Sequence, residues 1–179
     1  GIARMLLGSV AEVVVRHATC DVLTIPLQTA ATTAPIAKRI LVATDFSDAA
    51  KVAVQVAAAM AAQFGAELHM LHVVQNEHLT PAVGGLVFSH DFDVEQIMRE
   101  KLEELKKELS AKGVVSHVVA AELPALAIAD YVDGHDIDLV LVGTHGRTGA
   151  KRLLIGSVAE RVVRHAHCPV WVVRVPPAG

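Results

Sequence analysis

Aromatic side chains and cysteines are scarce in this chain of 179 residues. Aromatic residues make up only 3% of it, although hydrophobic residues as a whole make up 53%. That combination predicts a packed core of small and β-branched side chains and excludes a disordered chain. Two cysteines cannot form a disulfide framework, so we expect a reducing, cytoplasmic location.

Long apolar runs and an excess of positive charge are also missing. No apolar run reaches the roughly 18 residues that a membrane helix needs, and the first residues do not form a signal-peptide pattern. Lysine and arginine total 16 against 19 for aspartate and glutamate, and the pI is about 6.4. Nucleic-acid binding requires a basic surface. We therefore expect neither a membrane nor a nucleic acid as a partner.

The chain repeats part of itself. Residues 149–170 (GAKRLLIGSVAERVVRHAHCPV) repeat residues 1–22 (GIARMLLGSVAEVVVRHATCDV) at a constant offset of 148, and 15 of the 22 positions are identical. That offset has the size of one ordinary domain and is too long for a solenoid unit. We expect residues 1–26 to be the C-terminal remnant of a first domain, residues 27–37 to be a linker, and residues 38–175 to be a complete second copy.

The complete copy alternates short apolar runs, which predict strands, with segments of helical periodicity. The expected strands are Arg39–Thr44, Glu67–Val74, Val114–Ala121, Asp138–Gly143 and Val170–Val175. The expected helices run from Asp48 to Phe64, from Asp91 or Asp93 to Gly113, from Pro124 to about Val132, and from Ser157 to about Ala166. This alternation predicts an α/β fold with right-handed crossovers. We expect a Rossmann-like open sheet of five parallel strands, in the order 3-2-1-4-5, with helices on both faces.

Several polar residues are expected to mark the ends of these elements. Ser157 and Glu160 have the spacing of a capping box at the last helix. Asp45 follows the first strand and either begins a turn or caps the next helix. Asp136 and Asp138 precede the fourth strand, so we expect them to be solvated loop acids.

The segment after the fourth strand is rich in glycine and in basic residues. Its spacing G-x2-G-x9-G-S is formed by Gly143, Gly146, Gly156 and Ser157. Glycine at a strand end can adopt a positive φ and lets a ligand approach the backbone closely. A helix that begins at Ser157 offers free N–H groups and the positive end of its dipole to a phosphate. The loop also carries positive charge at Arg147, Lys151 and Arg152. Because ligands of such sheets bind at the carboxyl ends of the strands, we expect an anion site here.

Together with three other segments, this loop resembles the universal stress protein family. The segments are TDFS after the first strand, LHVV at the end of the second strand, and HCPVWVV at the end of the copy. The resemblance covers residues 38–175, and residues 1–26 resemble the last helix and strand of the same family. The glycine spacing is similar to that of the family's ATP-binding branch. The resemblance implies an ATP-binding protein, a nucleotide-responsive switch in the stress response.

The resemblance also implies a role for each matching residue. Asp45 would bond the adenosine, Ala43 and Thr44 would line the pocket, and the backbone of Val73 would hold the adenine. The ribose and phosphates would be wrapped by Gly143, Gly146, Arg147, Gly156, Ser157 and Val158. Any Mg²⁺ would be bound mainly by phosphates and water, because the loop offers no carboxylate. One departure is Leu123, which stands where the family often has a glycine before the proline.

Residues 1–26 need a partner surface. A lone helix and strand cannot bury their own apolar faces, and an exposed apolar strand edge invites pairing. We expect Val22–Ile25 to pair with Val170–Val175, either within the chain or between two chains. In the resembling family the last strand makes the dimer contact, which implies a homodimer through that strand.

Other functions stay open at this point. A dimeric interaction module of the same fold would bind no nucleotide, although the complete glycine spacing argues against it. An enzyme that uses adenine nucleotides would need a second substrate site or a redox motif, and the sequence has neither, so we expect at most slow ATP hydrolysis. A zinc site at His165, His167 and Cys168 lacks a fourth ligand, and the first copy has Thr19 in place of His167. We therefore favour histidines that interact with the end of a helix.

Overall fold

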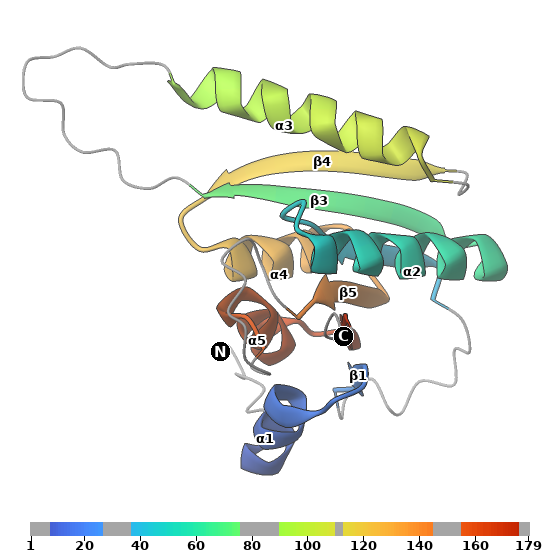
Figure 1. Ribbon diagram of the computed structural model, residues 1–179, viewed down its shortest axis with the longest axis vertical. Helices are drawn as coiled ribbons and strands as arrows, with labels where there is room; N and C mark the ends of the chain where they lie inside the picture. The colour runs from blue at the N-terminus through green and yellow to red at the C-terminus, as the bar shows by residue number, and fades with distance from the viewer. Residues whose placement is uncertain (1–7, 27–36, 76–89, 110–112, 145–154, 176–179) are drawn as a thin grey trace, which may run out of the picture.

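The computed structural model describes residues 8–26, 37–75, 90–109, 113–144 and 155–175, which form one sheet with helices on both faces (Figure 1). Its strands are β1 (Val22–Thr24), β2 (Arg39–Ala43), β3 (Glu67–Gln75), β4 (Val114–Ala121), β5 (Leu139–Gly143) and β6 (Val170–Val173). The order across the sheet is β1-β6-β5-β2-β3-β4. The strands from β2 to β6 are parallel to their neighbours, and their order confirms the predicted 3-2-1-4-5.

The first strand extends this sheet in the opposite direction. β1 pairs antiparallel with β6, with Leu23 opposite Trp171. The predicted pairing of Val22–Ile25 with the last strand is thereby confirmed, and it lies within the chain. In Figure 1, β1 and its helix lie at one end of the molecule, and β4 and α3 lie at the other end.

The helices cover both faces of the sheet. They are α1 (Ser9–His17), α2 (Asp48–Phe64), α3 (His90–Lys107), α4 (Pro124–Gly134) and α5 (Ser157–His165). α2 and α3 pack on one face, whereas α4 and α5 pack on the other. None of the described helices combines the length and the apolar character that crossing a bilayer requires.

Successive side chains of a strand point to opposite faces of the sheet, so each face has its own layer of the hydrophobic core. In β2, Ile40 and Val42 face the α2 and α3 side, and Leu41 faces the α4 and α5 side. All three side chains are completely buried, as expected for a central strand with both faces covered. On the first face α2 contributes mostly alanines, including Ala53 and Ala57, so this helix approaches the sheet closely without large side chains.

The predicted ends of two helices are wrong. Gly156, not Ser157, is the N-cap residue of α5; no side-chain hydrogen bond caps this end, and Ser157 is the first residue of the helix. A capping box pairs the N-cap residue with the residue three positions later, so with Gly156 as the cap Glu160 is one position too far along the helix. The Glu160 carboxylate instead contacts Arg16 at 3.0 Å and Arg164 at 3.4 Å.

The other helix that departs from its prediction is α3. It begins at His90, so the two proposed caps, Asp91 and Asp93, lie inside the helix. It also ends at Lys107, before Gly113, which has a φ of +70° directly ahead of β4. In contrast, α2 has its predicted bounds, and Gly65 ends it with a φ of +67°.

Asp138 is an exposed acid directly before β5, as predicted, and it also has backbone partners. Its Oδ2 atom accepts hydrogen bonds from the backbone N–H groups of Lys38 and Arg39, both at 2.8 Å. Asp136 forms an ion pair with the Arg39 guanidinium at 3.1 Å. The two acids therefore fix the start of β2 beside the start of β5.

Candidate functional site

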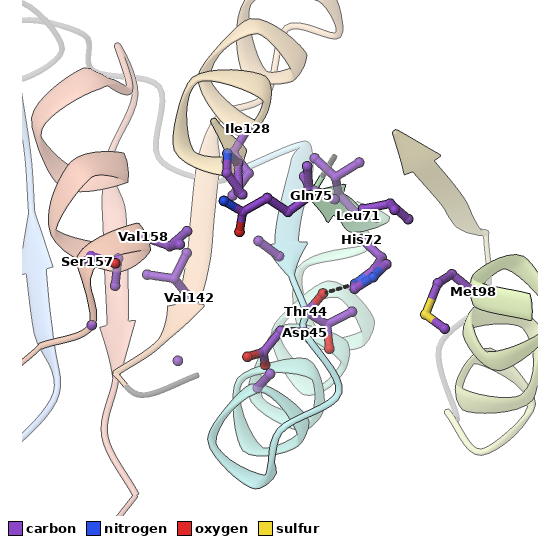
Figure 2. Close-up of a pocket in the computed structure, with 18 of the residues that line it drawn as sticks. Thr44, Asp45, Leu71, His72, Gln75, Met98, Ile128, Val142, Ser157 and Val158 are labelled. Atoms are coloured by element: carbon purple, nitrogen blue, oxygen red, sulfur yellow. Dashed lines mark hydrogen bonds between the residues drawn. The ribbon is translucent and has the colours of Figure 1, made fainter. Parts of the chain in front are cut away.

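A cavity of about 670 Å³ lies at the carboxyl ends of β2, β3 and β5. This is where the strand order reverses, between β2 and β5, and it is where ligands of open parallel sheets bind. The volume is in the usual range of small-molecule sites. Figure 2 shows that its labelled residues come from these strand ends, from α3 and α4, and from the start of α5.

Eight of the ten residues proposed from the sequence line this one cavity. They are Ala43, Thr44, Asp45, Val73, Gly143, Gly156, Ser157 and Val158. Gly146 and Arg147 lie outside the described residues. The wall is mostly apolar, with Leu71, Val142 and Ile128 among its other members. A mostly apolar wall with polar groups at one end suits a ligand that has a flat apolar part and a polar or charged part.

The turn after β2 positions Asp45 at the cavity. The Asp45 Oδ1 atom accepts a hydrogen bond from the Ser47 N–H at 3.0 Å, and Ser47 Oγ accepts one from the Ala50 N–H at 3.2 Å. Asp45 therefore begins the turn, and Ser47 caps α2, which decides between the two roles considered for Asp45. Between them Phe46 has a φ of +65°, an uncommon conformation for a residue with a side chain. Such backbone strain costs about 1–3 kcal/mol and occurs often at functional sites.

Gly143 is required for packing. A Cβ atom added to it would lie 2.8 Å from the carbonyl carbon of Ala49 and 3.0 Å from the nitrogen of Ala50. The sequence argument assigned this glycine to a positive φ and to close ligand approach, but among the described glycines only Gly65 and Gly113 have a positive φ. Because Gly143 has no Cβ atom, the backbone of the first turn of α2 can lie directly against the end of β5.

The start of α5 lies at the other side of the cavity. The Gly156 N–H donates to the Thr144 carbonyl oxygen at 2.6 Å, so the residues on either side of the glycine-rich segment meet at this point. Ser157 and Val158 are exposed residues of the first helical turn that line the cavity. The first N–H groups of a helix have no partner within the helix, and its dipole is positive at this end. This end of the cavity therefore favours an anion.

His72 is a cavity residue that the sequence argument missed. It is 6% exposed, and its Nδ1 atom donates a hydrogen bond to the Thr44 carbonyl oxygen at 2.7 Å. Its ring also packs against Phe46, with 4.7 Å between the centroids. The available signal was a histidine directly before Val73, in a strand that is mostly apolar but also contains His69.

The described residues that were considered for a zinc site do not form one. His167 Nδ1 lies 3.2 Å from both carboxylate oxygens of Asp133. Cys168 is buried, and burial raises the pKa of its thiol to about 12, so it stays protonated at neutral pH. In the part of the chain that the structure describes, no three or more His, Cys, Asp or Glu side chains are close enough to hold a metal ion.

Comparisons with known proteins match both the long copy and the short one. The profile of the Universal stress protein family matches residues 1–26 and 37–174. Universal stress protein MJ0531 of Methanocaldococcus jannaschii is 36% identical over 144 residues, which cover 78% of this chain and 83% of that protein. Universal stress protein Rv2005c of Mycobacterium tuberculosis is 34% identical over 174 residues, covering 97% of this chain and 58% of that protein.

Solved structures of similar proteins have the same fold. Universal stress protein UspA from Lactobacillus plantarum has a TM-score of 0.62 and 31% identity, over 76% of this chain and 97% of that chain. A universal stress protein in complex with cAMP has a TM-score of 0.55 and 25% identity, over 77% of this chain and 97% of that chain.

Proposed function

This chain belongs to the universal stress protein family, and we propose that its cavity at the carboxyl ends of β2, β3 and β5 binds an adenine nucleotide. The observation that carries this proposal is the cavity itself, which has an apolar wall on one side and the start of α5 on the other. A nucleotide has the matching division into a flat base and a charged phosphate chain. A structural relative in complex with cAMP adds support.

Each part of the nucleotide has a proposed partner. The backbone groups of Val73 hold the adenine, and Asp45 bonds the adenosine beside Ala43 and Thr44. The phosphates meet the N–H groups at the start of α5, near Ser157 and Val158, and Gly143, Gly146, Arg147 and Gly156 complete their surroundings. We propose ATP as the nucleotide. The residues fit this group, because the start of α5 offers N–H donors to phosphates and Asp45 is the only carboxylate among the described residues that line the cavity. Mg²⁺ would then be held by phosphate oxygens and water.

The proposed role is that of a nucleotide-responsive switch in the cytoplasm, with at most slow ATP hydrolysis. A switch of this kind works only if its partner distinguishes the bound state from the free state by a difference in binding free energy. The start of α5 could transmit the bound state, because Ser157 lines the cavity and the same helix contacts α4 and β6.

The domain division and the homodimer are part of the same proposal. Separate family matches over residues 1–26 and 37–174 support the interpretation of residues 1–26 as the end of a first universal-stress-type domain. A homodimer through the last strand has one further requirement. β1 already pairs with the edge of β6, so a second copy needs that edge to be vacated.

A charge placed at the start of α5 tests the site. Ser157→Asp adds a negative charge where the helix dipole favours one, so the free energy of unfolding should stay equal or rise by about 0.3–1 kcal/mol. The same charge should repel phosphates, since two unit charges about 4 Å apart near a protein surface interact by about 4 kcal/mol. We expect the variant to lose at least about tenfold in ATP affinity while its adenosine affinity changes little. Isothermal titration of ATP, AMP and adenosine measures both.

The repeat supplies a matched control. Ser9 has the same place at the start of α1 as Ser157 has in α5, and none of the described side chains of α1 lines the cavity. Ser9→Asp should leave ATP binding unchanged. Equal losses in both variants would argue against α5 as the phosphate site. Absence of binding by the wild type at millimolar ATP, together with no nucleotide released on denaturation, would refute nucleotide binding and favour an interaction module.

A further inference from the structure

β3 is longer than the strand that it pairs with on one side. The last pair between β2 and β3 joins Ala43 to Leu71, whereas β3 continues to Gln75 and pairs with β4 over its whole remaining length. After Ala43 the chain leaves the sheet through the turn at Asp45. The end of β3 therefore has β4 on one side and the cavity on the other, and all of its residues from Leu71 to Gln75 line the cavity.

Gln75 places a polar side chain at the apolar wall of the cavity. Side chains alternate along a strand, so Gln75 lies on the same face of β3 as Leu71 and Val73, which belong to the core on the α4 and α5 side. Figure 2 shows the Gln75 side chain extending from the end of β3 toward Ile128. A polar group placed at a mostly apolar wall is the kind of group that fixes the orientation of a ligand.

A hydrogen bond to the backbone orients the Gln75 amide. Its Nε2 atom donates to the carbonyl oxygen of Glu122 at 3.5 Å, two residues before α4 begins at Pro124. A carboxamide has two N–H donors on its nitrogen and an acceptor on its oxygen. With one N–H turned to Glu122, the amide can still offer its second N–H and its oxygen to a ligand in the cavity.

This donor and acceptor match one edge of adenine. Adenine carries an amino group at position 6, which donates, beside the acceptor N7, and a glutamine side chain pairs with both atoms at once. Guanine and hypoxanthine have an oxygen at position 6, so the amide oxygen would face a second acceptor there. A glutamine held in one orientation therefore distinguishes the two classes of purine.

We propose that Gln75 determines which base the cavity accepts. Its oxygen accepts from the 6-amino group, its second N–H donates to N7, and the cavity thereby selects 6-aminopurine nucleotides over 6-oxopurine nucleotides. The Glu122 carbonyl is the positioning group, because it holds the nitrogen end of the amide. This inference rests on the proposed function, since it requires a purine nucleotide in the cavity.

A substitution that removes the amide tests the proposal. Gln75→Met has a side chain of similar length without the donor and the acceptor, and Gln75 is exposed at a strand end, so the urea midpoint should change little. Isothermal titration compares ATP with inosine triphosphate (ITP), which has the same ribose and phosphates. We expect the wild type to bind ATP at least about fivefold more tightly than ITP. The variant should lose at least about fivefold in ATP affinity, while its ITP affinity stays equal or rises.

Two further measurements isolate the contact. The analogue 7-deaza-ATP has a C–H group in place of N7, so it should bind the wild type more weakly than ATP does, and the difference should disappear in Gln75→Met. Gln63→Met is the matched control, because Gln63 is an exposed glutamine of α2 and does not line the cavity. That variant should keep the affinities of all three nucleotides.

The possible failures are distinguishable. Equal losses of ATP and ITP affinity in Gln75→Met would show that Gln75 shapes the cavity without recognising the base. A wild type that binds ATP and ITP equally would likewise overturn the inference, although the cavity would still be a nucleotide site. A wild type that binds none of the three nucleotides at millimolar concentration would refute the proposed function and this inference with it.

Discussion

His72 donates a hydrogen bond from its Nδ1 atom to the carbonyl oxygen of Thr44, across 2.7 Å. Both residues are almost completely buried, and they join the end of β3 to the end of β2. The Thr44 N–H in turn donates to the Leu71 carbonyl oxygen at 2.9 Å, so the two strands are held together one residue beyond the end of β2. These contacts fix the floor of the cavity beside Asp45.

Removing the donor of this bond should destabilise the protein. His72→Phe keeps an aromatic ring against Phe46 but provides no N–H for the Thr44 carbonyl, so we expect the free energy of unfolding to fall by about 1–3 kcal/mol. Urea denaturation measures the change. His72→Asn is the matched control, because its amide retains a donor near the Nδ1 position and only the ring contact is lost. A greater loss in the asparagine variant would show that ring packing, not the hydrogen bond, dominates.

Gly143→Ala should be strongly unfavourable, because the new Cβ would lie 2.8 Å from the backbone of Ala49. Forcing α2 away from the end of β5 should cost about 1–3 kcal/mol or more. Gly134→Ala is the control in the same fold, since a Cβ there meets no atom within 4 Å and Gly134 ends α4. That variant should be neutral or more stable by up to about 1 kcal/mol. Thermal unfolding of both proteins side by side tests the difference, and equal losses would contradict it.

Asp45 has a structural role and a proposed binding role, and two substitutions separate them. Asp45→Asn keeps an Oδ1 acceptor for the Ser47 N–H, so stability should stay within about 0.5 kcal/mol of the wild type. Asp45→Ala removes the acceptor and should cost about 1 kcal/mol. If the carboxylate bonds the adenosine, both variants should bind adenosine and ATP more weakly. An asparagine variant with unchanged stability and unchanged affinity would assign Asp45 to the turn alone.

Acid should destabilise the protein through a histidine cluster at the other end of the sheet. His69 Nδ1 lies 2.8 Å from the Tyr131 hydroxyl, and the His69 ring stacks 6.4 Å from the ring of His117. Tyr131 in turn stacks on His135, with 3.8 Å between the centroids. Burial lowers the pKa of both His69 and His117, and the charge of neighbouring His135 lowers each further, whereas Glu67 opposes the shift at His69.

The sign of the pH effect follows from these pKa values. A histidine with a lowered pKa in the folded state binds fewer protons there than in the unfolded state, so stability rises with pH. The free energy of unfolding should therefore decrease as the pH falls below about 6.5, the value for an unfolded histidine. Urea denaturation at about pH 7.5 and about pH 5 measures this. The double variant His69→Gln with His117→Gln should reduce the slope, whereas His17→Gln, at an exposed residue of α1, should preserve it. An unchanged slope in the double variant would assign the effect to other groups.

The sequence predicts the strands and the bounds of α2 because these depend on local patterns. Apolar runs such as that of β2 and the stop at Gly65 are local signals, and each of them is confirmed. Two contacts that the sequence did not predict join residues far apart in the chain. Glu160 pairs with Arg16, which is 144 positions away, and Asp138 accepts from the N–H of Arg39, 99 positions away.

The sequence predicted some residues of the candidate site and missed others. The resemblance supplied Asp45, Val73 and Ser157, which do line one cavity. It did not supply His72, whose partner is a backbone carbonyl and leaves no motif. The positive φ expected at Gly143 was wrong, and the sequence did not predict its close neighbour, because only the folded chain brings α2 there.

The two cysteines occupy equivalent positions in the repeat but differ in accessibility. Cys20 is exposed, whereas Cys168 is buried and its thiol has a pKa of about 12. Maleimide dyes react with accessible thiolates, so mild treatment at neutral pH should label Cys20 alone. The folded wild-type chain thus carries a single attachment point for a fluorophore or a spin label, in the connection between α1 and β1. A probe attached there follows the movement of that segment without any engineered cysteine.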